Sequence, residues 1–245
     1  MKLVRHHHIR IMSVLQSFNT EIMRAAECYF GGGTAIALMI DEYRTSVDID
    51  FLCSSREGYS DLRELVHQKG IEGLFLQDTP VQLRSPRIDK EGIRTIFEVE
   101  GQPIKFEIVS EGRVDLKGEA SDLPLPTLSK ACLFVEKLMA NADRGMDKSG
   151  LSKDFLDLIM MQHKWGEIPD SALLTARKAY KSAVADYYEK VFNLLEKDRA
   201  HLAYCFDRLD INEKGVEIIS DYFMNKDNAN YIRRRLQAID STHPM

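Results

Sequence analysis

Two aspartates lie two residues apart in an apolar stretch of this sequence. Asp48 and Asp50 alternate with Ile49 and Phe51, which is the spacing of a β-strand with one face toward a core. On one strand the two carboxylates share a face, with Cα atoms roughly 6 to 7 Å apart. Paired carboxylates suit a hard divalent cation, Mg²⁺ or Mn²⁺, when phosphate oxygens complete its shell. The spacing therefore predicts that Asp48 and Asp50 are metal ligands and catalytic residues.

A glycine turn precedes the aspartates. Gly31, Gly32 and Gly33 are followed by Thr34, whose hydroxyl can cap the helix that the apolar run at 35–40 indicates. Glycines at a helix amino terminus expose backbone N–H groups, and such groups bind phosphate. We therefore predict that Gly32, Gly33 and Thr34 bind the phosphate groups of a ligand.

A third carboxylate commonly completes a site for two metal ions, which lie about 4 Å apart. Glu107 is our candidate, because it alternates with Phe106 and Ile108 and so points away from the core. Asp115 is the reserve candidate, in a segment with the composition of a loop. We predict that Glu107 is the third metal ligand and a catalytic residue.

The elements that position these residues follow from the periodicity of the apolar residues. Before the glycines we expect one helix followed by a short strand at Tyr29 and Phe30. A strand carries the aspartates, and a later pair of strands forms a hairpin. The expected helices cover 11–28, 35–43 and 60–68, and the expected strands cover 47–53, 71–76, 93–100 and 104–109. These elements predict an α/β (α+β) first half, a small mixed β-sheet backed by helices.

Prolines mark the end of this first half. The stretch Leu123-Pro124-Leu125-Pro126 disfavours both helix and sheet, and the pattern after it is almost purely helical. We predict two domains, residues 1–125 and residues 126–245, the second a helical-bundle lobe that closes the cleft. Its helices are expected over 128–140, 153–163, 171–196, 199–209, 216–224 and 231–239.

The composition is that of an ordinary globular protein. Of 245 residues, 44% are hydrophobic and 29% are charged, and the formal net charge is -5. This charge argues against a protein that clamps nucleic acid over its whole surface. No stretch approaches the roughly 20 apolar residues of a membrane-spanning helix, and the four cysteines form no C-x-x-C pair. We expect a cytoplasmic protein with reduced thiols and no membrane partner.

Several motifs of the chain resemble one protein family. A glycine pair followed by Thr, an apolar helix, an Arg-x-Ser element and Asp-x-Asp on a strand are together similar to the DNA polymerase β-type nucleotidyltransferase superfamily. More narrowly, GGTAIAL, YRTSVDIDF and SKDFLDL resemble the AbiEii/AbiGii toxins, the nucleotidyltransferase half of bacterial type IV toxin–antitoxin systems. The resemblance covers residues from about 30 to 161.

The resemblance implies a nucleotidyltransferase fold that transfers a nucleotide from an NTP to an acceptor hydroxyl. The acceptor would be an RNA such as a tRNA, or a protein, and an antitoxin would be the partner. Lys137 in FVEKLMA would contact the triphosphate. Asp154, with Asp157 in KDFLDL, would be a catalytic residue that assists metal, nucleotide or acceptor proton. Ser46 would contact phosphate, and Arg44 would bind phosphate or support the structure.

Two other functions remain open. An antibiotic-modifying type of nucleotidyltransferase, which acts on small molecules, shares the motif of the first half. A nucleotide-binding or interaction module could also keep the fold without turnover. The family's third acidic position is more often aspartate, so Glu107 departs from its pattern. Without a second metal the chain would work by binding alone.

A run of histidines and a run of arginines are assigned no role in the site. His6, His7 and His8 are interpreted as a flexible arm or a tag remnant. The basic run at 233–235, consisting of Arg233, Arg234 and Arg235, is interpreted as a solvated helix face.

Overall fold

The computed structural model describes residues 3–242, and the chain divides into two compact units. The first, called here the sheet unit, comprises Met1–Glu42 and Ser46–Ser129. The second, the helical unit, comprises Lys130–Met245 together with the segment Tyr43–Thr45. The chain thus enters the helical unit briefly before it reaches Asp48, which a single boundary at the prolines does not anticipate.

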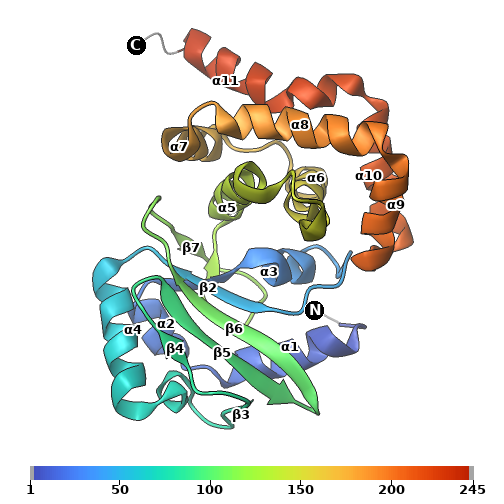
Figure 1. The fold of residues 1–245 in the computed structure, drawn as a ribbon. Coiled ribbons are helices and arrows are strands. Elements are labelled where there is room, and N and C mark those ends of the chain that lie inside the picture. Colours follow the sequence, from blue (N-terminus) through green and yellow to red (C-terminus); the bar gives the residue numbers. More distant parts are fainter. Residues whose placement is uncertain (1–2, 243–245) are drawn as a thin grey trace. The chain divides into compact units, whose positions relative to one another are not determined.

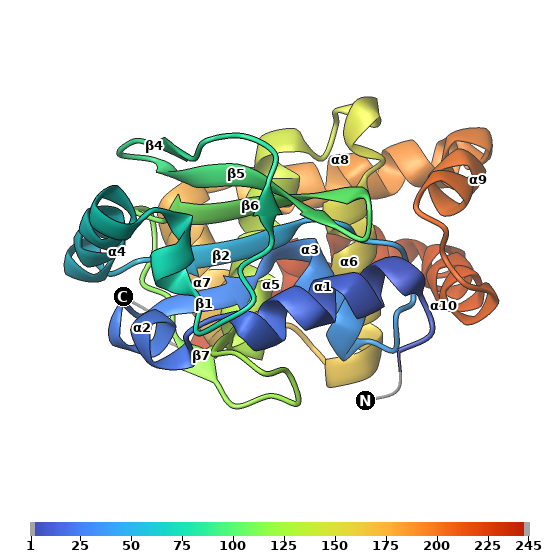
Figure 2. The ribbon, with the colours of Figure 1, turned by 90° about the horizontal axis from the view of Figure 1, so that it is seen from below.

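An eight-stranded mixed sheet forms the centre of the sheet unit. Its order is β3-β5-β6-β2-β1-β8-β7, with β4 paired to β5. Figure 2 shows β4, β5, β6, β2 and β1 side by side. Strand β2 is antiparallel to β1 and parallel to β6, so it is hydrogen-bonded on both sides. The predicted mixed sheet backed by helices is confirmed. The strands are β1 (Cys28–Gly31), β2 (Ile49–Cys53), β3 (Val81–Gln82), β4 (Arg87–Ile88), β5 (Gly92–Val99), β6 (Gln102–Ser110), β7 (Gly118–Glu119) and β8 (Thr127–Leu128).

Helix α1 (His6–Ser17) covers one face of this sheet (Figure 2). Its apolar stripe is continued by Phe18, whose ring centroid lies 5.2 Å from that of Phe51 and 5.6 Å from that of Phe106. Aromatic pairs of this kind contribute about 0.5–1.5 kcal/mol each beyond their burial. Phe51 therefore anchors β2 to the core, while its neighbour Asp50 alternates to the other face.

The helix expected over 11–28 is wrong, because two helices occupy the region. Helix α1 ends at Ser17, and α2 (Thr20–Ala25) follows it. The side chain of Asn19 accepts hydrogen bonds from the backbone N–H groups of Glu21 and Ile22. This cap starts a new helix inside a continuous apolar pattern.

The strand expected over 71–76 is also wrong. Helix α4 (Arg56–Lys69) ends at Gly70, where φ is 71°. The next residues form the short 3-10 helix η1 (Ile71–Leu74). Ile71 and Leu74 are both 0% exposed, and a spacing of three residues buries a helical turn rather than one face of a strand.

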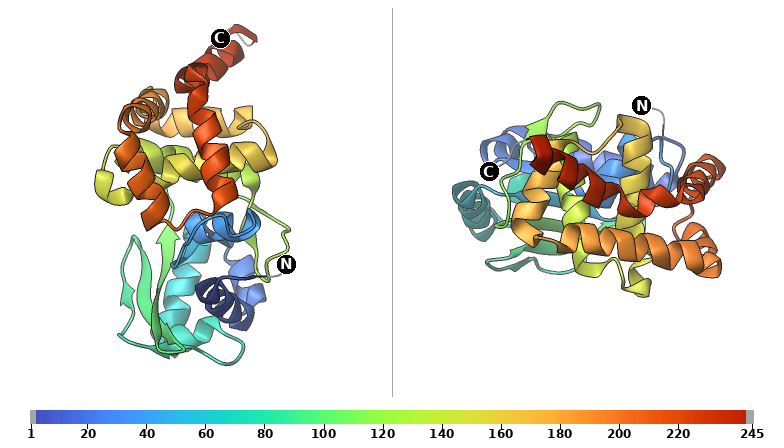
Figure 3. Two further views of the ribbon diagram at one scale, coloured as in Figure 1. Left: turned by 90° about the vertical axis from the view of Figure 1, so that its right-hand side faces the viewer. Right: turned by 90° about the horizontal axis from the view of Figure 1, so that it is seen from above.

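The helical unit is built around α5, which contacts α6, α7 and α8 (Figure 1). Figure 3 shows the unit from two further directions, with α11 against α7 and α8. The helix expected over 171–196 is divided, because Lys181 adopts φ 56° between α7 and α8. The helices are α5 (Lys130–Arg144), α6 (Lys153–Trp165), α7 (Asp170–Tyr180), α8 (Ala183–Lys197), α9 (Arg199–Arg208), α10 (Glu213–Met224) and α11 (Tyr231–Thr242).

None of the helices within residues 3–242 combines the length and the apolar character needed to cross a membrane. All four cysteines are buried, and none of them forms a disulfide.

Candidate active site

The glycine turn lies directly against Asp50. Strand β1 ends at Gly31, the antiparallel register partner of Asp50, and α3 (Gly32–Met39) begins at the next residue. Gly32 has φ 67°, in the left-handed region that favours glycine. A Cβ on Gly32 would lie 2.5 Å from Oδ2 of Asp50. Only glycine therefore lets this carboxylate approach the turn so closely.

Thr34 connects the turn to the segment before Asp50. Its side chain is 0% exposed, and Oγ1 donates a hydrogen bond of 2.5 Å to the backbone carbonyl of Asp48. The same oxygen lies 2.9 Å from Oγ of Ser46. The expectation that Thr34 caps the helix is wrong, because α3 begins two residues earlier and has no side-chain cap. The first N–H groups of a helix have no intrahelical acceptor, so this terminus suits an anion.

The two aspartates alternate with core residues as the sequence predicts. Ile49 and Phe51 are both 0% exposed, whereas Asp48 and Asp50 are half-buried. Strand β2 begins at Ile49, so Asp48 directly precedes the strand that it was expected to share with Asp50. Of the two aspartates, Asp50 lies within β2 and is the one next to the glycine turn.

Glu107 lies beside Asp50 in the sheet. The parallel strands β2 and β6 pair these two residues in register, so their side chains share a face. Arg94, the antiparallel partner of Glu107 on β5, places Nε 2.5 Å from Glu107 Oε1 and Nη1 3.3 Å from Asp89 Oδ1. Sequence reasoning did not identify Arg94, because its role depends on the register of the hairpin. Asp115 is exposed in the loop before β7.

The donor set at this site fits a divalent metal only in part. Within residues 3–242, no three His, Cys, Asp or Glu side chains converge as a metal-binding group. Asp50 and Asp48 nevertheless offer hard oxygen donors near a helix terminus with backbone N–H groups that suit an anion, and such donors fit Mg²⁺ or Mn²⁺ that arrives with phosphate. Glu107 would have to break its ion pair with Arg94 before it could bind the metal.

Arg44, Lys137 and Asp154 lie in the helical unit, within one buried ion network. Arg44 Nε and Nη2 donate to Oδ1 and Oδ2 of Asp157 at 2.7 and 2.9 Å. Lys137 Nζ lies 2.6 Å from Asp157 Oδ2 and 2.8 Å from Asp154 Oδ1. Arg144 Nε donates to Asp154 Oδ2 at 2.7 Å. Apart from Arg144, these residues are at most 5% exposed.

The network stays charged and carries a surplus of positive charge. Burial alone would lower the pKa of Lys137, but its carboxylate partners outweigh burial and raise it. Burial would raise the pKa of Asp154, but Lys137 and Arg144 hold it well below its usual range. Lys153, half-buried at the start of α6, has its pKa lowered by burial and by Lys137. With Arg44, Lys137 and Arg144, the cations of the network outnumber its two carboxylates.

The residues predicted from the sequence thus fall into two groups, each collected within its own unit. The sheet unit brings together Gly32, Gly33, Thr34, Ser46, Asp48, Asp50 and Glu107. The helical unit brings together Arg44, Lys137 and Asp154. The pairing of Asp157 with Arg44 joins positions that are 113 residues apart, so no local pattern indicated it.

His8 is a neighbour of the site that sequence reasoning missed. The interpretation of residues 6–8 as a flexible arm is wrong, because they begin α1 and His8 is 0% exposed. His8 Nδ1 lies 2.7 Å from Glu42 Oε1, and Nε2 accepts a hydrogen bond of 3.3 Å from the backbone N–H of Ser46. Nothing in a run of three histidines distinguishes the one that is buried.

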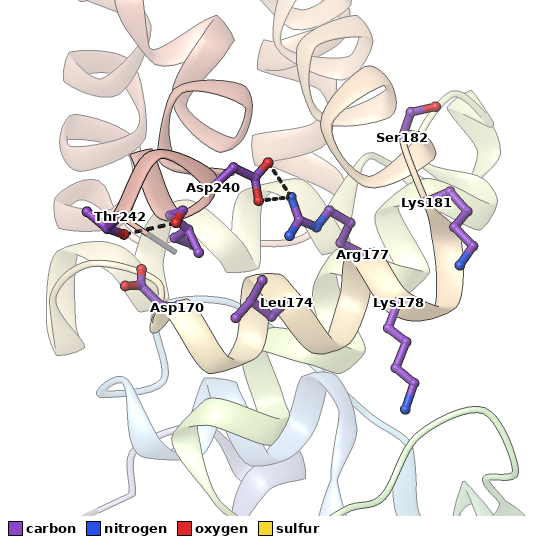
Figure 4. Close-up of a pocket in the computed structure, with 9 residues that line it drawn as sticks. Asp170, Leu174, Arg177, Lys178, Lys181, Ser182, Asp240 and Thr242 are labelled. Carbon is purple, nitrogen blue, oxygen red and sulfur yellow. Dashed lines mark hydrogen bonds and ion pairs between the residues drawn. The ribbon is translucent and has the colours of Figure 1, made fainter. Parts of the chain in front are cut away.

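A groove of about 1060 Å³ lies between α7 and α11 in the helical unit (Figure 4). Arg177 of α7 and Asp240 of α11 form an ion pair there, with Nη1 3.0 and 2.9 Å from the two carboxylate oxygens. Figure 4 shows Lys178 and Lys181 directed away from this pair. The predicted site residues are not among those that line the groove, so it is not the candidate active site.

Comparisons with known proteins agree with this geometry. A solved structure of a presumed nucleotidyltransferase from H. pylori aligns over 97% of this chain and 99% of its own, with 14% identity and a TM-score of 0.52. That likeness shows a shared fold. JHP933 from Helicobacter pylori aligns over 98% of this chain and 97% of its own, with 14% identity and a TM-score of 0.47, and no argument rests on it. No curated protein matches the chain.

A family model gives the assignment. The model described as nucleotidyl transferase AbiEii toxin, type IV toxin–antitoxin system, matches residues 16–244, which is nearly the whole chain. This match includes both the glycine–aspartate site of the sheet unit and the ion network of the helical unit. The chain therefore belongs to the AbiEii family of nucleotidyltransferase toxins.

Proposed function

We propose that the chain transfers a nucleotide from an NTP to an acceptor hydroxyl of RNA, as the toxin of a type IV system with a cognate antitoxin. The acceptor oxygen attacks the α-phosphorus of the NTP. The bond from that phosphorus to the bridging oxygen of the β-phosphate breaks, and the hydroxyl proton passes to a base. The products are the extended acceptor and pyrophosphate.

One observation carries this proposal, the contact between the glycine turn and Asp50. A Cβ at Gly32 would lie 2.5 Å from Oδ2 of Asp50, so the proposed metal ligand lies directly against the helix terminus that we propose binds phosphate. A divalent metal held by Asp48 and Asp50 would offset the charge of the triphosphate and hold it in line for attack. Glu107 is the proposed third ligand, in register with Asp50.

The residues of the sheet unit bind and orient the triphosphate. The backbone N–H groups of Gly32, Gly33 and Thr34 at the start of α3 bind its β- and γ-phosphates and then the leaving pyrophosphate. The Ser46 hydroxyl, 2.9 Å from that of Thr34, contacts a phosphate oxygen. These contacts stabilise negative charge without any rearrangement of the turn.

The residues of the helical unit take different roles. We propose a structural role for Arg44, because the two carboxylate oxygens of Asp157 accept hydrogen bonds from Nε and Nη2 along one edge of its guanidinium group. Lys137 is proposed to contact the triphosphate. Asp154 is a weak base because its pKa is held far below its usual range, so we propose that it orients Lys137 rather than accepting the acceptor proton. That the helical lobe closes over the nucleotide stays a prediction.

The test is transfer of α-³²P-labelled NTPs, one base at a time, to total bacterial RNA in the presence of Mg²⁺. Asp50→Asn and Asp48→Asn should each lower label incorporation and pyrophosphate release about 100-fold or more. Asp61→Asn, at an exposed position of α4, is the matched control and should transfer at the normal rate. Equal transfer by Asp50→Asn and Asp61→Asn would end the proposal.

The destination of the label separates the alternatives. Label in small molecules instead of RNA would identify an enzyme of the antibiotic-modifying type, and label in protein would identify a protein acceptor. Mg²⁺-dependent NTP binding without pyrophosphate release from any acceptor fraction would identify a silent binding module.

A further inference from the structure

We propose that His8 and Glu42 are positioning residues for the segment 46–48, which carries the proposed phosphate contact Ser46 and the proposed metal ligand Asp48. His8 is 0% exposed and lies between the two partners. Its Nδ1 donates to Glu42 Oε1 at 2.7 Å, and its Nε2 accepts from the Ser46 N–H at 3.3 Å. Because Nε2 is an acceptor, the neutral ring carries its proton on Nδ1. The inference rests on the proposed function of Ser46 and Asp48.

The loop that His8 holds has a strained backbone. Asp41 and Glu42 both have φ 52°, and two consecutive non-glycine residues in the left-handed region persist only where surrounding contacts hold them. The Glu42 side chain supplies these contacts. It accepts from the N–H groups of Val4 at 2.7 Å and Arg5 at 3.2 Å, as well as from His8. Glu42 therefore fixes the start of α1 and the orientation of the His8 ring together.

Two short contacts through Thr34 connect Ser46 to Asp48. Ser46 Oγ lies 2.9 Å from Thr34 Oγ1. Thr34 in turn donates to the backbone carbonyl of Asp48 at 2.5 Å. A displacement of the Ser46 backbone therefore moves both a proposed phosphate contact and the residue that holds Asp48 to the turn. His8 touches neither nucleotide nor metal in this arrangement.

Protonation of His8 disrupts the arrangement. The imidazolium ion carries N–H groups on both nitrogens, so Nε2 then opposes the Ser46 N–H as a second donor. Burial lowers the pKa of His8, and the neighbouring Glu42 carboxylate partly offsets this effect. The positive charge of Arg5 also lowers the pKa of His8, and the centroid of the His7 ring lies 4.2 Å from that of the His8 ring. Activity should therefore fall at acid pH as His8 gains its proton.

Two variants separate positioning from simple support of the fold. His8→Gln can donate to Glu42 and accept from Ser46 but does not titrate. His8→Phe fills the space and can do neither. His67→Gln, at an exposed position of α4, is the matched control. We would measure kcat and KM for Mg²⁺·NTP transfer from about pH 5 to 9, with thermal unfolding of each variant.

We expect His8→Phe to lower kcat/KM about 10- to 100-fold at neutral pH. His8→Gln should keep most of the neutral-pH activity, and its acid limb should move to lower pH than in the wild type and His67→Gln. An unchanged acid limb in His8→Gln would overturn the proposal. The His8→Gln result decides the question even if His8→Phe does not fold, because a loss of folding would show only that His8 supports the structure.

A binding measurement keeps this inference separate from the proposed function. The backbone amide of Ser46 should shift in NMR spectra as His8 titrates, and the shift should vanish in His8→Gln. If the wild type neither binds nor transfers any NTP but the Ser46 amide follows His8, the proposed function fails and the coupling stands. If the wild type transfers NTP but the amide does not respond to pH, the coupling fails and the function stands.

Discussion

At the residue scale, Gly32 and Asp50 lie so close that the Asp50 carboxylate leaves no room for a side chain at position 32. The two-residue period of a strand and the short connection from Gly31 to Asp48 predicted this neighbourhood, because both features are local in sequence. His8 was missed for the opposite reason, since its partners Glu42 and Ser46 are 34 and 38 residues away. Local spacing therefore predicts which groups could react, whereas contacts between distant residues decide which group positions them.

A change at Gly32 tests this close approach. In Gly32→Ala, the new Cβ would meet the Asp50 carboxylate at 2.5 Å while the backbone stays at φ 67°. We expect NTP transfer to fall about 100-fold or more, because a displacement of about 1 Å at a reacting group has that effect. Gly101→Ala is the matched control, with φ 72° and nothing within 4 Å of its Cβ. Similar loss of activity in both would attribute the effect to backbone strain alone.

The pH dependence of stability also belongs to single residues. The pKa of buried His8 lies below its ordinary 6.5, so between these values the unfolded chain binds the proton more readily and falling pH favours unfolding. The stability from neutral His8 is complete above about pH 6.5 and is lost as pH falls through the folded-state pKa. Urea unfolding should show a smaller loss between about pH 7.5 and 5.5 for His8→Gln than for wild type.

The control for this prediction is His67→Gln, which should lose stability as the wild type does. The lowered pKa values of Asp154 and Asp157 affect a different window. Their stabilisation is complete above about pH 4 and is lost only below it. Equal pH slopes for His8→Gln and wild type would show that His8 does not titrate on unfolding.

At the scale of elements, the register between β2 and β6 decides which acids become neighbours. The two strands of the hairpin were predicted from alternation, and the structure has them as β5 and β6. Alternation gives the face of Glu107 but not its partners, which depend on pairing with both β2 and β5. The error at 71–76 has a related cause, because a short apolar run fits a strand or a 3-10 turn equally well.

The role of Glu107 can be tested through metal binding. If it is the third ligand, Glu107→Gln should weaken Mn²⁺ binding, measured by electron paramagnetic resonance with NTP present, and lower transfer about 10-fold or more. Glu98→Gln, at an exposed position of β5 in the same hairpin, should change neither quantity. Unchanged Mn²⁺ binding in Glu107→Gln would leave Glu107 only as the ion-pair partner of Arg94.

At the scale of the whole molecule, the chain forms two units whose boundary is not a single point. The prolines at 124 and 126 precede the change to helices, as composition alone suggested. The short segment Tyr43–Thr45 nevertheless belongs to the helical unit. It pairs Arg44 with Asp157, a contact that a pass along the sequence has no means to reveal.

Removing one charge of this pair should be costly. Asp157→Asn leaves the guanidinium of Arg44, 2% exposed, without its buried counter-charge, so we expect a loss of about 3–5 kcal/mol in the free energy of unfolding. Asp240→Asn breaks a similar two-oxygen pair with Arg177, but at side chains that are 60% and 32% exposed. Its loss should be about 0–1 kcal/mol, measured by urea unfolding. Equal losses would mean that burial does not determine the effect.

The segment Tyr43–Thr45 belongs to the helical unit although the sheet unit surrounds it in sequence. This arrangement constrains how relatives of this chain can diverge. A recombination event that exchanged everything after Ser129 for another helical half would leave Arg44 behind and remove the aspartate that neutralises it. The new helical half would therefore need an acidic residue at the position of Asp157. The two halves are therefore expected to be inherited together, and Arg44 should change only when Asp157, its distant partner, changes too.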